Sequence, residues 1–343
     1  MDWLPDFLCY IILVVLLAHN IASGAQAEYS DHQAKPGCNS TCGNLTIPYP
    51  FGVEEKCYLD EEFLITCNYS YDPPQPFLMN STSVMVTNIS ILGDLTINQL
   101  IAQECYYPPA HVFGPMASPG SNKGDTWSSL DLVSKFTVSE SRNKFTVVGC
   151  DSQGFIGGSR LNSSGLENDY SSGCMSVCDY KGSLDATSCT GSGCCQLEIP
   201  PGLVFTNVTA SSFNNHVYVW DFSPCTFAFI VEDGGFNFNS SYLDPNYMPE
   251  RMPVVLEWTV ATETSSSTIV CKGNATSYQT NNKFGYRCKC KEGYQGNPYL
   301  PYLQGGCQAI YALALRATMG MGCEMERVAN QFKRIKYHFS RSR

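Results

Sequence analysis

The chain has 343 residues, of which 43% are hydrophobic and 15% are charged, and this composition excludes an intrinsically disordered chain. Its formal net charge of −10 argues against a nucleic-acid partner, because a phosphate backbone requires a basic surface. The 18 cysteines are unusual, since a cytosolic protein rarely carries so many thiols unless it binds metal. We therefore expect an oxidising compartment in which the cysteines pair as disulfides.

The N-terminus is typical of a secretory signal peptide, which we predict over residues 1–27. Residues 8–18 form an apolar run, and the sequence AQA at 25–27 offers the small residues that signal peptidase accepts. Asp2 and Asp6 replace the usual basic region, so an uncleaved N-terminal anchor is the alternative. The run is shorter than the ~20 apolar residues that a membrane span needs, and no later run is longer. We expect a secreted, extracellular chain without a membrane span.

Acceptor sequences for N-linked glycosylation support this location. They are spread over the whole chain, which favours a glycoprotein whose modified asparagines lie on solvent-facing loops or edges. The nine predicted sites are Asn39, Asn44, Asn68, Asn80, Asn88, Asn162, Asn207, Asn239 and Asn274.

Two even groups of cysteines predict up to eight disulfides, and Cys323 is left over. The first group has twelve members, whose pairing the spacing does not fix: Cys38, Cys42, Cys57, Cys67, Cys105, Cys150, Cys174, Cys178, Cys189, Cys194, Cys195 and Cys225. The second group is Cys271, Cys288, Cys290 and Cys307. The adjacent Cys194 and Cys195 should reach different partners. Zinc is the competing interpretation, but no second ligand pair completes a site, so we expect no metal and no cofactor.

Short apolar or β-branched runs between Gly, Pro and Asn predict a mainly β, disulfide-rich fold with short strands. In the run 135–150, two alternating segments flank the sequence SESRN, which predicts a β-hairpin. Residues 171–195 are rich in Ser, Gly and Cys and depend on disulfides for their structure. Residues 261–270 are the clearest linker.

The unit 271–307 contains the pattern Y-x-C-x-C-x-x-G-Y-x-G followed by a later Cys, which resembles the C-terminal half of an EGF-like module. Two of the usual six cysteines have no counterpart here. The EGF pattern then implies the pairs Cys271–Cys288 and Cys290–Cys307, which leave no thiol without a partner.

Three motifs together resemble the extracellular part of plant wall-associated receptor kinases. They are GCNSTCGNLTIPYPFGV at 37–53, GCCQLEIPPGL at 193–203 and GYRCKCKEGYQGNPYLP at 285–301. The resemblance implies a galacturonan-binding N-terminal domain at 37–150, a Cys-rich second part at 151–260 and a partial EGF-like module at 271–307. It also implies contact with pectin in the cell wall, at the outer face of the plasma membrane.

The chain departs from that family in several respects. No kinase motif and no transmembrane segment follow the module, and residues after Cys307 lack the carboxylates of a calcium-binding EGF repeat. Residues 308–343 are basic, with apolar residues at helical spacing. This pattern is typical of an amphipathic helix that contacts a membrane or a partner. The alternative, which we favour, is a tail from an alternative or shifted reading frame.

A binder of polygalacturonate needs local cations, because residues 28–307 carry 14 basic and 27 acidic residues. Two groups of cations qualify, and each could instead simply keep a β edge soluble. The first group is Lys135, Arg142 and Lys144 on the predicted hairpin; the second is Lys272, Lys283, Arg287, Lys289 and Lys291. Tyr49 and Phe51 could stack on sugars, although we favour core or turn packing for both.

No nucleophile motif accompanies the five histidines, so we expect no enzyme and no catalytic residue. The favoured function is non-catalytic binding of acidic cell-wall polysaccharide, with pectin or oligogalacturonides as ligand. The alternatives are a protein-interaction or soluble decoy ectodomain that binds extracellular proteins or receptor ectodomains, and a truncated receptor kinase.

Overall fold

The computed structural model describes residues 33–106, 126–133, 135–161, 167–178, 180–184, 188–260, 270–280 and 285–310. Within these residues the chain is mainly β, as the sequence predicts. The short 3-10 helices are η2 (Glu61–Phe63), η3 (Lys181–Ser183), η4 (Ser240–Leu243) and η5 (Tyr302–Gln304). The predicted signal peptide and nearly all of the predicted linker and basic tail lie outside the described residues. In the described part of the chain, no helix combines the length and apolarity needed to cross a bilayer.

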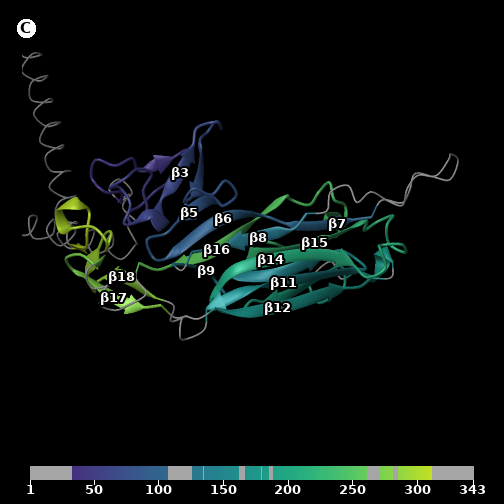
Figure 1. The fold of residues 1–343 in the computed structure, drawn as a ribbon. Coiled ribbons are helices and arrows are strands. Elements are labelled where there is room, and N and C mark those ends of the chain that lie inside the picture. The colour runs from purple at the N-terminus through teal and green to yellow at the C-terminus, as the bar shows by residue number, and fades with distance from the viewer. Residues whose placement is uncertain are drawn as a thin grey trace, which may run out of the picture.

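A ten-stranded antiparallel sheet runs along the molecule (Figure 1). Its order is β12-β11-β14-β9-β16-β6-β5-β4-β3, with β8 paired to β14. The strands are β3 (Ile65–Asn68), β4 (Gln75–Leu78), β5 (Met85–Ile89), β6 (Asp94–Leu100), β8 (Ser128–Asp131), β9 (Phe136–Val138), β11 (Ser152–Leu161), β12 (Glu167–Ser176), β14 (Leu203–Ser212) and β16 (Arg251–Trp258). Strands from 37–150 and from 151–260 therefore share one sheet.

A second, four-stranded sheet has the order β13-β10-β15-β7. Its strands are β7 (Ala102–Cys105), β10 (Asn143–Val148), β13 (Cys194–Glu198) and β15 (Cys225–Glu232). One face packs against the ten-stranded sheet, where Phe145 and Ile230 join its core. The other face, which includes Phe227 and Phe229, is covered by residues such as Leu243. Burial on both faces explains the continuous apolar sequence of β15.

The predicted hairpin over 135–150 is wrong. The strand β9 pairs with β14 and β16, whereas β10 pairs with β13 and β15, so the intervening turn carries the chain from one sheet to the other. The buried Asn143 side chain joins the two sheets at this point. Its Nδ2 donates to the carbonyl oxygens of Ser139 and Val255, both at 2.7 Å, and its Oδ1 accepts from the Val255 amide at 2.9 Å.

Eight disulfides join the sixteen cysteines of the two predicted groups. Cys194 and Cys195 bind different partners, as expected. The pairs are Cys38–Cys57, Cys42–Cys67, Cys105–Cys225, Cys150–Cys178, Cys174–Cys195, Cys189–Cys194, Cys271–Cys288 and Cys290–Cys307. The last two are the pairs that the EGF pattern implies. Among the described residues, no group of His, Cys, Asp and Glu side chains has the arrangement of a metal site.

Small two-stranded sheets complete the fold. One contains β1 (Thr41–Cys42) and β2 (Leu45–Thr46). The hairpin β17 (Ala275–Gln279) and β18 (Tyr286–Cys290) and the pair β19 (Tyr294–Gln295) and β20 (Gln308–Ala309) form the EGF-like unit. In Figure 1 this unit lies at the same end of the molecule as β3, far from β7.

The EGF-like unit packs tightly against the N-terminal residues. Asn297 Nδ2 donates to the carbonyl oxygens of Gln33 at 2.9 Å and Tyr49 at 2.6 Å. The Tyr299 ring lies 5.6 Å from that of Trp258, and its hydroxyl accepts from the Cys288 amide. Burial raises the pKa of the Tyr299 phenol, so this hydroxyl stays protonated.

Candidate functional site

The first predicted cation group does not form one positive surface. Lys135 precedes β9 in the ten-stranded sheet, and its side chain, 18% exposed, forms ion pairs with Asp60 and with Glu62 at 3.4 Å. Its Nζ also lies 5.3 Å from the centre of the Phe63 ring. This lysine therefore ties η2 and the preceding Asp60 to the start of β9, and its charge is matched locally.

The other two members of that group are matched in the same way. Arg142 Nη1 lies 2.8 Å from Asp94 Oδ2 and its Nη2 lies 2.8 Å from Glu232 Oε1. The hydrogen bond to Glu232, followed by the charge of Asp94, raises the pKa of the guanidinium. Lys144 Nζ lies 3.5 Å from a carboxylate oxygen of Glu198 and 3.5 Å from one of Asp233, so its charge is also matched locally. Each cation of the group thus has two acidic partners.

Arg287, from the second predicted group, is a buried structural residue. Its Nε donates to the Trp258 carbonyl at 2.6 Å and its Nη2 lies 3.4 Å from Glu257 Oε2. The guanidinium lies directly against Gly93, where an added Cβ would come within 2.3 Å of it. Gly93 also has a φ of +113°, so a larger residue is disfavoured there on both grounds. Arg287 fastens the EGF-like unit to the ten-stranded sheet and is inaccessible to a polymer.

The remaining described cations of the second group lie on or beside the β17–β18 hairpin. Lys272, Lys289 and Lys291 are exposed, and Lys289 Nζ lies 5.2 Å from the centre of the Tyr278 ring. No ion pair between described residues includes Lys289 or Lys291. Lys283 lies outside the described residues. We call Lys272, Tyr278, Lys289 and Lys291 the hairpin surface.

Tyr49 and Phe51 belong to the packed core and its border. Phe51 is fully buried, and its ring meets those of Phe63 and Trp258 edge to face at 5.0 and 5.4 Å. Tyr49 is half-buried, and burial raises the pKa of its phenol. Core or turn packing, the interpretation favoured from the sequence, describes Phe51 in the core and Tyr49 packed against it; the buried Phe51 ring cannot support a sugar.

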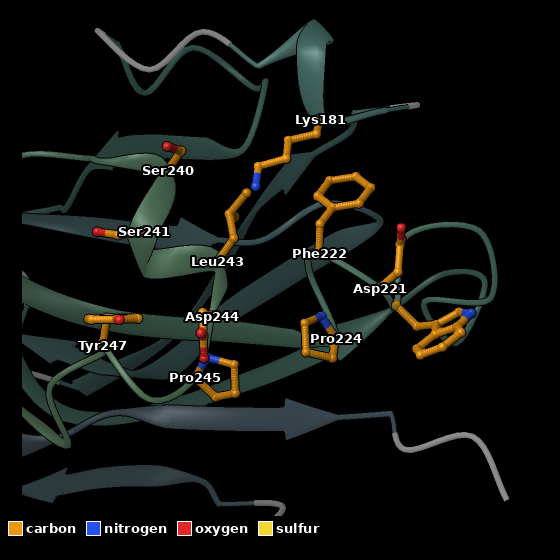
Figure 2. Close-up of a pocket in the computed structure, with 11 residues that line it drawn as sticks. Lys181, Asp221, Phe222, Pro224, Ser240, Ser241, Leu243, Asp244, Pro245 and Tyr247 are labelled. Carbon is orange, nitrogen blue, oxygen red and sulfur yellow. The ribbon is translucent and has the colours of Figure 1, made fainter.

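A cavity of about 370 Å³ lies near η3 and η4, and the sequence analysis did not single it out. In Figure 2, Phe222 and Pro224 lie on one side of it, and Ser241 and Tyr247 lie on the other. The full lining is Lys181, Trp220, Asp221, Phe222, Pro224, Ser240, Ser241, Leu243, Asp244, Pro245 and Tyr247. One lysine and two aspartates give this lining no excess of positive charge. The cavity therefore suits an uncharged polar ligand better than a polyanion.

A buried chain of polar groups contains the types of side chain used in nucleophilic catalysis. Ser152 Oγ lies 2.8 Å from Thr226 Oγ1, which lies 3.2 Å from His216 Nε2. Glu104 Oε2 lies 3.5 Å from the same imidazole nitrogen. Ser152, Thr226 and His216 have no exposed surface, so no substrate reaches the hydroxyls in this structure. The group connects β7, β11 and β15 and acts as a polar part of the core.

The predicted glycosylation sites within the described residues lie at the surface. Six of these asparagines are exposed, and Asn68 and Asn274 are half-buried. The exposed ones are Asn39, Asn44, Asn80, Asn88, Asn207 and Asn239. Asn162 lies outside the described residues. Attachment of a sugar to the exposed asparagines requires no rearrangement of the core.

Residues 38–99, from the first disulfide to β6, match the family model for wall-associated receptor kinase galacturonan-binding domains. Wall-associated receptor kinase 2 of Arabidopsis thaliana is 38% identical over 285 residues, covering 81% of this chain and 35% of the relative. Wall-associated receptor kinase 3 from the same plant is 34% identical over 321 residues, covering 88% and 39%. The chain thus spans well under half the length of these relatives. No solved structure matches it.

Proposed function

The chain is related in sequence to the ectodomain region of wall-associated receptor kinases, and on this premise we propose that it binds acidic cell-wall polysaccharide of the polygalacturonate class. The observation that carries the proposal is the match of residues 38–99 to the galacturonan-binding family. Binding would take place outside the cell and would break no bond in the polymer. The sealed position of Ser152, Thr226 and His216 supports a non-catalytic role.

Charge limits where a polyanion can bind. Residues 38–99 contain one basic residue, Lys56, and seven acidic residues. At physiological salt such charges act over ~8 Å, so this region by itself would repel polygalacturonate. We call residues 38–99 the matched region. A binding surface that extends from the matched region onto adjacent basic side chains avoids this repulsion.

The hairpin surface offers that cationic neighbour. The EGF-like unit contacts the matched region directly, through Asn297 and Tyr49 and through Arg287 against Gly93. Thr276 pairs with Lys289 and Tyr278 pairs with Arg287, so these four side chains share one face of the hairpin, on which Arg287 is buried and Lys289 is exposed beside the half-buried Tyr278 ring. We assign the uronate carboxylates to Lys289 and Lys291, with the Tyr278 ring beside the sugar. Each exposed charge contact contributes ~0.2–1 kcal/mol, so affinity depends on repeated contacts along the polymer.

The experiment measures binding of the secreted protein to immobilised de-esterified polygalacturonate at increasing salt. We expect strong loss of binding by about 0.5 M salt, because screening there is severe. Lys289→Ala combined with Lys291→Ala should weaken binding about tenfold, which corresponds to ~1.4 kcal/mol. The matched control is Arg142→Ala combined with Lys144→Ala, which removes two cations that already have acidic partners.

Three results would contradict the proposal. Binding retained at about 0.5 M salt would show that charge does not drive it. Equal retention of fully methyl-esterified polymer, whose carboxylates are blocked, would show that the ligand is not recognised as an anion. If only the control substitutions weakened binding, the polymer would contact Arg142 and Lys144 at β10 and not the hairpin surface.

A further inference from the structure

The outward face of β8, β14, β11 and β12 exposes two phenylalanine rings. Residues 205, 207 and 209 of β14 point outward, since they are exposed while Thr206 and Val208 between them are buried. Phe205 is 37% exposed and Phe155, on the neighbouring strand β11, is 45% exposed. Covering such a ring with another group removes apolar surface from water, which is favourable.

An acceptor asparagine lies on this same face. Asn207 pairs with Gly157 of β11 on one side and with Ser129 of β8 on the other, and both neighbours are small. An added Cβ on Gly157 would contact only Tyr170 O, at 3.8 Å, so the space beside Asn207 is open. The Thr209 side chain, which completes the acceptor sequence, points to the same side. The strand therefore presents Phe205, Asn207 and Thr209 in one row.

Of the two rings, Phe205 is the one that stands next to Asn207. It precedes Asn207 by two residues on the same face, a separation of ~7 Å along a strand. Phe155 instead leans over β12, where an added Cβ on Gly173 would come within 2.7 Å of its ring. The Phe205 ring is thus positioned within reach of the first sugar of a glycan on Asn207.

We propose that Asn207 carries an N-linked glycan whose first N-acetylglucosamine packs on the Phe205 ring. The Asn207 amide nitrogen attacks the anomeric carbon of a lipid-diphosphate-linked oligosaccharide. A C–N bond forms, the sugar–phosphate C–O bond breaks, and the lipid diphosphate leaves with the electron pair while the amide loses one proton. The C–H groups of the sugar then contact the electron-rich face of the ring.

This glycan would act as a permanent cover for the sheet face. It would stabilise the protein by shielding Phe205 from water, in addition to its effect on solubility. It would also keep a long polymer away from β8, β11 and β14.

The first measurement is glycopeptide mass mapping of the chain secreted from a glycosylating host, which should show Asn207 occupied. The glycans are then trimmed to single N-acetylglucosamine residues. In an NMR spectrum, the N-acetyl methyl signal that disappears in Asn207→Gln should be shifted upfield by the ring current of Phe205. In Phe205→Ser that signal should return to the position typical of the free sugar.

Thermal unfolding provides an independent measurement of the same contact. Loss of the glycan in Asn207→Gln should lower the melting temperature by about 2 °C, and the same substitution in a Phe205→Ser background should have little effect. Asn88→Gln is the matched control, because Asn88 is also exposed on a strand but lies opposite Thr96. An unoccupied Asn207, an unshifted methyl signal, or equal melting effects in both backgrounds would overturn the proposal.

Discussion

At the scale of single residues, charge pairing decides which cations remain available to a ligand. Lys135, Arg142 and Lys144 are closely surrounded by acidic side chains, and Arg287 is buried. Lys289 and Lys291 stay exposed on the hairpin. Arg142 and Arg287 thus have different roles, the first on the surface and the second in the core.

Arg287 provides the prediction at this scale. Replacing it with Ala removes the donor to the Trp258 carbonyl and the cationic partner of Glu257, which keeps its hydrogen bond from Ser139, and leaves space beside Gly93. We expect a loss of about 3 kcal/mol in the free energy of unfolding, measured by urea titration, because a buried charged partner is lost. Lys289→Ala, two residues along the same strand, should cost less than ~0.5 kcal/mol. Similar losses for both variants would contradict a buried structural role for Arg287.

The sequence could not have separated these residues. All five cations of the second group share one short segment, and only its packing against Trp258 and Gly93 distinguishes Arg287 from its neighbours. That Phe51 packs inward could be predicted from the sequence, because an aromatic residue in a turn motif usually packs into the core. Its partner Trp258 could not, since it comes from a distant part of the chain, and the ring contact with Phe63 depends on how the loop between them folds.

At the scale of elements, the strands were easier to predict than their partners. Local alternation of apolar and polar residues indicates a strand, and it placed both β9 and β10 correctly within 135–150. Pairing depends on strands far away in the sequence, so the turn between them was misread as a hairpin turn. In the EGF-like unit the disulfide partners could be predicted, because both disulfides close short segments within residues 271–307 and the EGF pattern implies their pairing.

Disulfide loop length provides the prediction at the scale of elements. Cys105–Cys225 closes a separation of 120 residues, whereas Cys189–Cys194 closes one of 5. Both lie at the same apolar cluster, so the effects of removing buried sulfur are comparable. In the chain-entropy account, replacing both cysteines with Ala should cost about 3 kcal/mol more for the long loop.

Denaturant unfolding under non-reducing conditions measures this difference. Mass mapping of each variant should first show that the other seven disulfides are intact. A larger loss for the short loop would mean that local strain or packing, and not restriction of the unfolded chain, governs the contribution of these bonds.

At the scale of the whole molecule, strands from residues 37–150 and from residues 151–260 pair within the same sheets, so these two parts of the chain form one structural unit. Strand β16 lies between β6 and β9, so residues 251–258 join the strands β3 to β6 of the N-terminal part to the rest of the ten-stranded sheet. The EGF-like unit then returns to the N-terminal residues. The proposed polymer surface depends on this arrangement, because it joins the acidic matched region to the cations of the hairpin.

Asn297 tests whether the two ends of the described chain are held together. Asn297→Ala removes the hydrogen bonds to the carbonyl oxygens of Gln33 and Tyr49, and also the acceptor for the Tyr299 amide. Because Tyr49 N–H donates to Gln33 O, we expect its amide to exchange about tenfold faster, equivalent to ~1.4 kcal/mol. Hydrogen–deuterium exchange with mass spectrometry measures this, and Gln295→Ala, on the exposed strand β19, is the control. Unchanged exchange at Tyr49 would show that the N-terminal residues are held independently of the EGF-like unit.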